Sequence, residues 1–303
     1  MSHVQTVELV PNQGWDERIL VCRNGELVDV FIVVTQRYVV IVDTLINATT
    51  AEKLMTFATP HLVNGRSLLI VNSHADYDHA WGNQLFAGPH ALYPAPIIAH
   101  ERCIEEFAVW AEDLAAMREK EPDVFGEVVL TPPNLLFNGR FALHGGDLIL
   151  QLIPTFGHTR DHISVYIPEI RTLLAADAAE LPYPMPRHAS GMGEMRQSLA
   201  QLAALQAETV LYCHAPVTMG GKLLHDNIAY FDALEAACRR ALAAGTLPET
   251  ISDDDDLAAL VGCTFAQAMP PDFDPASVHE YYATKGHNGQ IKAMVEWLRG
   301  IGD

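Results

Sequence analysis

The chain lacks the features that mark a secreted or membrane protein. Its five cysteines are scattered and form no CxxC pair, so we expect neither a disulfide framework nor a thiolate zinc cluster. No apolar run approaches the roughly 18 residues that a bilayer-spanning segment needs. The first residues also lack the basic and apolar parts of a secretory signal. These absences predict a soluble, cytoplasmic protein with no membrane partner.

Positive charge is also scarce. The sequence has 19 Lys and Arg residues against 38 Asp and Glu residues, which gives a formal net charge of −19. A protein that follows a phosphate backbone needs the opposite balance. We therefore expect a small-molecule substrate of modest charge and no nucleic-acid partner.

The apolar pattern predicts an α/β chain. Of the 303 residues, 49% are hydrophobic, which is enough for a large core. Short apolar runs predict antiparallel strands at 19–22, 27–34 and 38–43, and a hairpin that turns at Gly145-Gly146. Helical patterns cover 80–86, 195–206, 222–244 and 257–269, and another helix starts at Thr49 or Thr50 as its cap.

The densest cluster of reactive side chains is the stretch His74-Ala75-Asp76-Tyr77-Asp78-His79. It directly follows the apolar run 67–71, which reads as a buried strand that ends at Asn72-Ser73. Four potential metal ligands in six residues would repel one another or be costly to desolvate without a cation. The stretch therefore predicts a metal site at the end of a strand.

Three more apolar strands end in residues that bind metals. His158 lies in a glycine-containing loop after the hairpin, Asp177 ends the run 172–176, and His214 follows the run 209–213. Strand ends on the same edge of a layered α/β structure lie close in space. We therefore expect these residues to meet the cluster at 74–79.

With its ligand residues in this order, the chain resembles the metallo-β-lactamase superfamily over residues 17 to 225. The resemblance implies an α/β (α+β) fold, a four-layer αββα sandwich of two mixed sheets with the site along one edge. We expect a catalytic domain at 1–225 and a helical C-terminal extension at 226–303 that packs on it. The extension carries no motif, and covering the site or forming a homodimer contact are both open to it.

The resemblance also implies the role of each ligand in a dinuclear centre. His74 and His158 would hold a first metal ion, Asp78, His79 and His214 a second, and Asp177 would bridge both. A hydroxide between the two ions would attack a carbonyl carbon, and Asp78 would orient the leaving group or relay a proton to it. The implied activity is that of a metallo-hydrolase acting on an ester, thioester, lactone or lactam.

Asp76 departs from the commonest pattern of this family, since the motif is HxDxDH where HxHxDH is usual. A carboxylate lowers the net charge of the cluster, and an oxygen donor shifts metal preference from zinc toward manganese or iron. We expect two divalent ions, with zinc as the first expectation. The alternative for Asp76 is a carboxylate that orients a neighbouring histidine.

Two other functions remain open at this point. An iron-dependent oxidoreductase of the same superfamily could use these ligands, and a non-catalytic metal-binding protein would keep them without turnover. Tyr77 within the cluster is expected to contact the substrate, and so are three residues of the proline-rich segment after Asp177, namely Tyr183, Met185 and His188. Their alternatives are core packing for Tyr77 and a proline-stiffened surface loop for the other three.

Overall fold

The computed structural model describes residues 6–89, 91–188, 190–216, 220–252 and 255–300. The chain forms two compact units. Unit 1 comprises residues 1–154, 160–176 and 207–218, and unit 2 comprises residues 155–159, 177–206 and 219–303. The expected domain boundary at residue 225 and the packing of the helical extension stay predictions.

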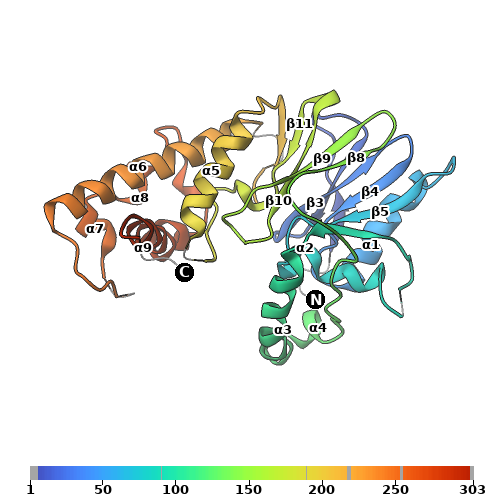
Figure 1. Cartoon of the computed structure of the whole chain (residues 1–303), viewed down its shortest axis with the longest axis horizontal. Helices are drawn as coiled ribbons and strands as arrows, with labels where there is room; N and C mark the ends of the chain where they lie inside the picture. The colour runs from blue at the N-terminus through green and yellow to red at the C-terminus, as the bar shows by residue number, and fades with distance from the viewer. Residues whose placement is uncertain (1–5, 90, 189, 217–219, 253–254, 301–303) are drawn as a thin grey trace. The chain divides into compact units, whose positions relative to one another are not determined.

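The first sheet of unit 1 mixes antiparallel and parallel pairs (Figure 1). Strands β1 to β4 pair antiparallel, whereas β4 to β7 run parallel. In sheet order the strands are β1 (Val7–Leu9), β2 (Ile19–Asn24), β3 (Val28–Val34), β4 (Tyr38–Val42), β5 (Ser67–Val71), β6 (Ile97–His100) and β7 (Leu135–Phe137). The three predicted antiparallel strands are confirmed as β2, β3 and β4, while β1 was not predicted.

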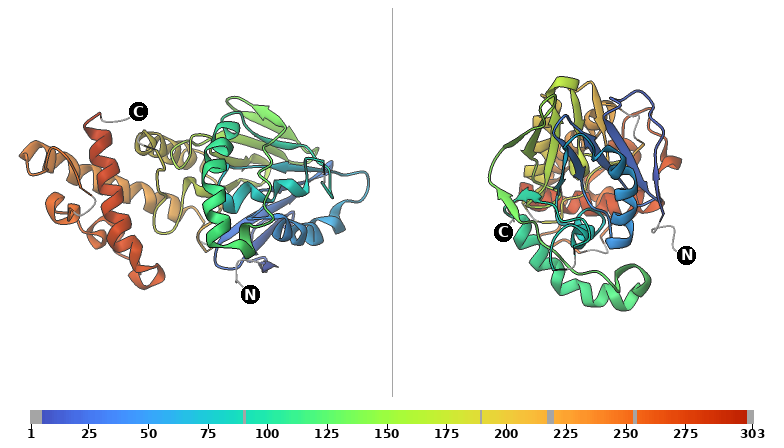
Figure 2. Two further views of the ribbon diagram at one scale, coloured as in Figure 1. Left: turned by 90° about the horizontal axis from the view of Figure 1, so that it is seen from below. Right: turned by 90° about the vertical axis from the view of Figure 1, so that its right-hand side faces the viewer.

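The second sheet faces the first across one apolar core (Figure 2). In sheet order it consists of β12 (Thr209–Leu211), β11 (Thr172–Leu174), β10 (Ile163–Ile167), β9 (Ile149–Pro154) and β8 (Phe141–His144). Only the β11–β12 pair is parallel among the described strands of this sheet. The prediction of two mixed sheets in an α/β chain is confirmed.

Helix α1 (Ala48–Ala58) packs against the first sheet and begins earlier than predicted. Its cap is Asn47, whose side chain accepts a hydrogen bond from the backbone N–H of Thr50 at 3.0 Å. Thr50 is the third helical residue and completes a capping box with Asn47. The prediction of Thr49 or Thr50 as the cap was therefore wrong.

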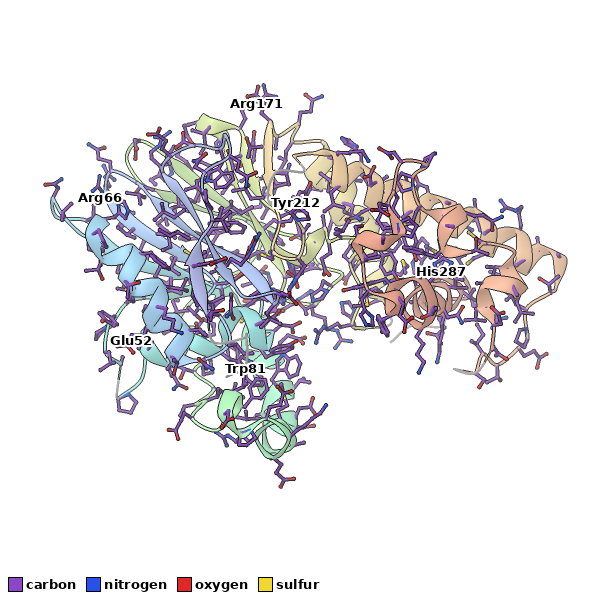
Figure 3. The ribbon with its side chains drawn as sticks, turned by 180° about the vertical axis from the view of Figure 1, so that it is seen from behind. Glu52, Arg66, Trp81, Arg171, Tyr212 and His287 are labelled. Atoms are coloured by element: carbon purple, nitrogen blue, oxygen red, sulfur yellow. The ribbon has the colours of Figure 1, made fainter. Side chains whose placement is uncertain are left out.

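The segment after the motif forms two short helices where the sequence suggested one. Helix α2 (Tyr77–Ala80) is followed by the 3₁₀ helix η3 (Trp81–Leu85). Gly82 lets this segment approach the end of β4, since an added Cβ would lie 2.1 Å from the Thr44 carbonyl oxygen. Helices α3 (Cys103–Lys120) and α4 (Pro122–Phe125) complete the helices near the motif in unit 1, and Figure 3 labels the buried Trp81 beside them.

Unit 2 is helical. It contains α5 (Gly191–Ala203), α6 (Lys222–Ala244), α7 (Leu257–Val261), α8 (Phe265–Ala268), the π-helix η7 (Tyr282–Gly286) and α9 (His287–Leu298). Helix α5 starts before its predicted start at residue 195. The helix predicted at 257–269 is split, because Gly262 adopts a left-handed φ of 65° and Thr264 caps α8. Within the described residues, no helix is long and apolar enough to cross a membrane.

Candidate metal centre

Unit 1 brings three potential metal ligands together, two of them on α2 after β5 and the third after β12. The distance from His79 Nε2 to His214 Nε2 is 3.4 Å, from Asp78 Oδ2 to His214 Nε2 3.4 Å, and from Asp78 Oδ2 to His79 Nε2 3.8 Å. His79 is fully buried, whereas the His214 side chain is 22% exposed. The set is therefore buried at His79 and accessible to solvent at His214.

These spacings match the needs of a small divalent cation. Two ligand atoms, each about 2.0–2.1 Å from a tetrahedral zinc ion, lie about 3.4 Å apart. Two imidazole nitrogens and one carboxylate oxygen are also zinc ligands by type. Asp78, His79 and His214 therefore fit a metal ion.

Asp43, which the sequence analysis did not assign, orients this set. Its carboxylate accepts hydrogen bonds from the Ser73 backbone N–H at 2.7 Å, from the Ser73 hydroxyl at 2.6 Å and from His79 Nδ1 at 2.9 Å. Because His79 donates through Nδ1, its Nε2 lone pair faces Asp78 and His214. Asp43 lies one residue after β4, and a carboxylate directly after an apolar strand was the signal that could have revealed it.

The same network reaches His74 and Asp76. The Ser73 hydroxyl donates to Asp43, so its oxygen accepts from His74 Nδ1 at 2.9 Å. His74 Nε2 then lies 3.5 Å from Asp76 Oδ2, which is again the spacing of neighbouring ligands on one ion. The structure thus places Asp76 beside His74 with a geometry that suits a direct ligand.

In unit 2, His158 and Asp177 form a second pair of donors. His158 Nδ1 donates to the Met185 carbonyl oxygen at 2.9 Å, and His158 Nε2 lies 3.5 Å from Asp177 Oδ2. Gly157 precedes the histidine with a φ of +135°, and an added Cβ would lie 2.4 Å from the Met195 backbone. Only glycine fits that position.

Glu180, a second residue that sequence reasoning missed, joins this pair. It is buried, and its Oε1 lies 3.7 Å from His158 Nδ1, on the ring edge opposite Asp177. The side chain of Asn227 on α6 holds the backbone here, bonding to Glu180 N at 3.1 Å, Glu180 O at 2.9 Å and Pro182 O at 2.8 Å. No sequence pattern links Asn227 to Glu180, since 47 residues separate them.

His74, Asp76, Asp78, His79 and His214 thus lie in unit 1, and His158 and Asp177 in unit 2. Each set gathers donor atoms within reach of one another. That the two sets together hold two ions, with Asp177 as the bridge, stays a prediction.

The residues predicted to contact the substrate have different surroundings. Tyr77 packs edge-on against three aromatic rings, with Trp110 at 6.0 Å between ring centroids. Met185 and His188 are half-buried, and His188 Nδ1 lies 3.1 Å from the Ser190 hydroxyl. Their contact with a substrate stays a prediction.

Tyr183 lies in the core of unit 2. Its ring stacks on Tyr230 of α6 with centroids 4.5 Å apart, and its hydroxyl donates to the Tyr282 carbonyl at 2.6 Å. Burial raises the pKa of the Tyr183 phenol, as does the neighbouring Tyr281. The side chain is 0% exposed and presents no surface to a substrate here.

Carboxylates also gather near Asp76. Burial, and next the neighbouring Asp161, raises the pKa of Glu106 on α3 to about 7, and Asp76 adds to the shift. The five cysteines, by contrast, are all buried and free. Burial raises the pKa of Cys238 to about 12, so this thiol is not a reactive nucleophile.

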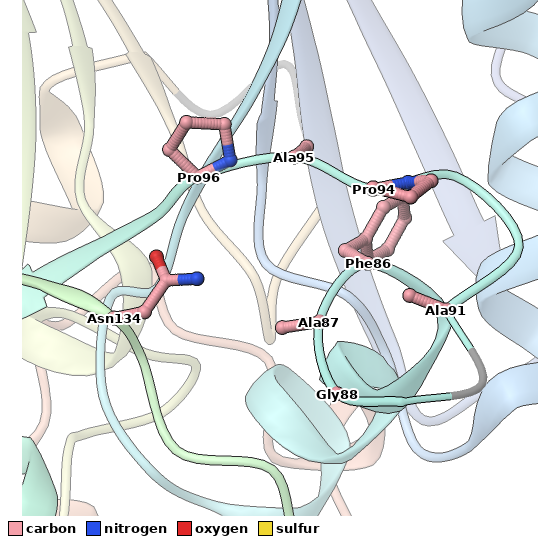
Figure 4. Close-up of a pocket in the computed structure, with 8 residues that line it drawn as sticks. All are labelled: Phe86, Ala87, Gly88, Ala91, Pro94, Ala95, Pro96 and Asn134. Carbon is pink, nitrogen blue, oxygen red and sulfur yellow. The ribbon is translucent and has the colours of Figure 1, made fainter.

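A separate pocket of about 430 Å³ opens in unit 1 (Figure 4). Its wall is formed by Phe86, Ala87, Gly88, Ala91, Pro94, Ala95, Pro96 and Asn134. None of these residues belongs to either donor set, and nearly all of them are apolar. The pocket is therefore not part of the metal centre.

Comparison with known proteins matches the sequence and the fold to one family. The family model described as Metallo-beta-lactamase superfamily covers residues 23–214, well over half of the chain. A metallo-beta-lactamase family protein from Thermus thermophilus has a similar structure, with a TM-score of 0.59 at 19% identity over 97% of this chain and 93% of that one. The stereoselective inverting sec-alkylsulfatase of a Pseudomonas species has a TM-score of 0.67 at 17% identity over 95% of this chain and 50% of that one.

A curated relative gives a shorter match. The chain is 34% identical over 86 residues to the hydroxyacylglutathione hydrolase of Mesorhizobium japonicum, which covers 26% of this chain and 31% of the relative. The chain thus matches about a third of that relative's length. The fold implied by the sequence resemblance, an αββα sandwich with C-terminal helices, is confirmed by the solved structures. The chain therefore belongs to the metallo-beta-lactamase superfamily.

Proposed function

We propose that the chain is a metal-dependent hydrolase that cleaves an ester, thioester, lactone or lactam bond in a small molecule. The observation that carries the proposal is the set of Asp78, His79 and His214, whose donor atoms lie 3.4 to 3.8 Å apart. We propose zinc at this set, and a second divalent ion as the resemblance to the family implies. Manganese or iron is the alternative where Asp76 is a ligand.

Bound divalent cations supply such a site with hydroxide at neutral pH and with Lewis acidity. The protein's own contribution is to hold the donors in place. Asp43 keeps the Nε2 lone pair of His79 directed at the set. In this proposal Asp78, whose side chain is 8% exposed, would orient the leaving group or relay a proton to it.

The substrate class follows from charge and similarity. The net charge of −19 disfavours strongly anionic substrates. The similarity to a hydroxyacylglutathione hydrolase supports a thioester as the first class to test. Esters, lactones and lactams react through the same attack on a carbonyl carbon.

A panel of chromogenic thioesters, esters, lactones and lactams tests the proposal, with the protein as purified and after chelation. His214→Gln should lower kcat/KM for the preferred class about a hundredfold or more, since a metal ion contributes several kcal/mol to such reactions. The matched control is His225→Gln, an exposed position on α6. Hydrolysis that continues unchanged after chelation would overturn the proposal. So would the absence of hydrolysis of every substrate by the metal-loaded protein. Oxygen uptake without hydrolysis would identify an oxidoreductase instead.

A further inference from the structure

Helix α3 places an indole against the carboxylate that departs from the family motif. Trp110 Nε1 donates a hydrogen bond to Asp76 Oδ1 at 3.1 Å, and both residues belong to unit 1. The Trp110 ring packs edge-on against Trp81, with centroids 5.5 Å apart, and against Tyr77 at 6.0 Å. Packing on two aromatic rings fixes the direction of the indole N–H.

The two oxygens of Asp76 consequently have different surroundings. Oδ1 accepts the indole hydrogen bond, whereas Oδ2 lies 3.5 Å from His74 Nε2. Asp76 stands at the N-cap position of α2, but its side chain makes no capping hydrogen bond there. The carboxylate is therefore oriented by Trp110 and not by the helix that it precedes.

We infer that Trp110 is a positioning residue that presents Asp76 as a one-oxygen ligand beside His74 and thereby sets the metal preference of this position. The inference rests on the proposed metal binding. An indole N–H donates but cannot accept, so it occupies one carboxylate oxygen without competing for the ion. A carboxylate that binds through one oxygen occupies one coordination position, as an imidazole nitrogen does. A carboxylate that binds through both oxygens occupies two positions and suits larger ions with more oxygen ligands.

Two substitutions separate the hydrogen bond from the ring. Trp110→Phe keeps an aromatic ring but removes the donor, and Trp110→Gln keeps an N–H donor but removes the ring. The matched control is Trp15→Phe, which loses an indole bond to the Ile19 carbonyl at 2.9 Å instead of one to a carboxylate. The dissociation constants for Zn²⁺ and Mn²⁺ are measured by competition with a chromogenic chelator, beside the melting temperature of each metal-free protein.

Trp110→Phe should weaken Zn²⁺ binding about 10–100-fold, as expected for loss of a group that orients a ligand, and should weaken Mn²⁺ binding less. Trp110→Gln should bind Zn²⁺ more tightly than Trp110→Phe, and Trp15→Phe should bind both ions like wild type. In an Asp76→His background the effect of Trp110→Phe should disappear, since the two residues act as a pair.

The outcomes separate the inference from the proposed function. Absence of metal binding by the wild-type protein would overturn both. Metal binding by wild type with unchanged Zn²⁺ affinity in Trp110→Phe would overturn the inference alone. The inference alone would also be overturned if Trp110→Phe lowered Zn²⁺ affinity equally in the Asp76→His background. Tighter Zn²⁺ binding by Trp110→Phe than by Trp110→Gln would overturn it too.

Discussion

The two donor sets differ in what holds them in place. In unit 1, buried side chains hold the donors: Asp43 bonds to His79, and Ser73 links Asp43 to His74. In unit 2, backbone groups and helices hold them: His158 bonds to a carbonyl, and Asn227 bonds to the backbone at Glu180 and Pro182. The first arrangement is local to the strand ends, and the second depends on residues far along the chain.

This difference assigns a role to the C-terminal helices. Besides Asn227 on α6, Gln290 of α9 donates to the Pro184 carbonyl at 3.1 Å, and Tyr183 bonds to the Tyr282 carbonyl. These contacts hold the segment 180–185, which contains the carbonyl that orients His158. Within unit 2, the C-terminal helices are thus part of the support of the donors.

The largest expected effect comes from breaking the side-chain network of unit 1. In Asp43→Asn, an amide nitrogen replaces one accepting oxygen, so Ser73 and His79 no longer both find an acceptor. Metal affinity at the unit 1 set should fall about 10–100-fold, which a chelator competition titration measures. Asp147→Asn, which alters a surface carboxylate that accepts from the Gln36 N–H, is the control. Equal affinities in the two variants would show that Asp43 does not orient the ligands.

A smaller effect on metal binding, confined to unit 2, is expected for Asn227→Leu. The substitution leaves buried backbone groups unpaired at about 1–3 kcal/mol each, so the free energy of unfolding should fall and one Co²⁺ per chain should bind more weakly. The control is Asn47→Leu, which removes bonds to Thr50 N and Val124 O in unit 1. It should lower the free energy of unfolding without changing Co²⁺ binding. If Asn227→Leu bound Co²⁺ as tightly as wild type does, α6 would not support the donors of unit 2.

The smallest effect concerns Glu106, near the donors of unit 1. Its folded pKa of about 7 lies above the ordinary value of 4.5, so folding favours the protonated form. The contribution of protonated Glu106 to the free energy of unfolding is fully present below pH 4.5 and is lost as the pH rises through about 7. Relative to wild type, Glu106→Gln should therefore be more stable at pH 8 than at pH 5, as measured by urea unfolding. Glu105→Gln controls for the loss of one charge, and a difference that is the same at both pH values would contradict the prediction.

Much of unit 1 was predictable because its information is local. Alternating and continuous apolar runs predict β2 to β5, and ligand residues directly after apolar strands identify the cluster at 74–79 and His214. The same rule applied to β4 would have identified Asp43, which was instead included in the strand. The bond from Trp110 to Asp76 could not be predicted, since nothing in the sequence tells which neighbour an indole N–H meets.

Unit 2 was less predictable because tertiary contacts decide the positions of its residues. Glu180 and Asn227 have no shared motif, and their hydrogen bonds exist only once α6 has packed. Tyr183 illustrates the converse, since an aromatic residue in a proline-rich segment suggests a substrate contact. Stacking on Tyr230 buries it instead. Helix ends also differed from the predicted ones where a glycine or a capping residue interrupts a continuous apolar pattern, as Gly262 does after α7.

The most direct test of the metal centre is a crystal structure of the metal-loaded protein with anomalous scattering recorded at the metal edges. We predict an anomalous peak about 2.0–2.2 Å from Asp78 Oδ2, His79 Nε2 and His214 Nε2. No peak at these atoms in protein that hydrolyses its substrate would contradict the account.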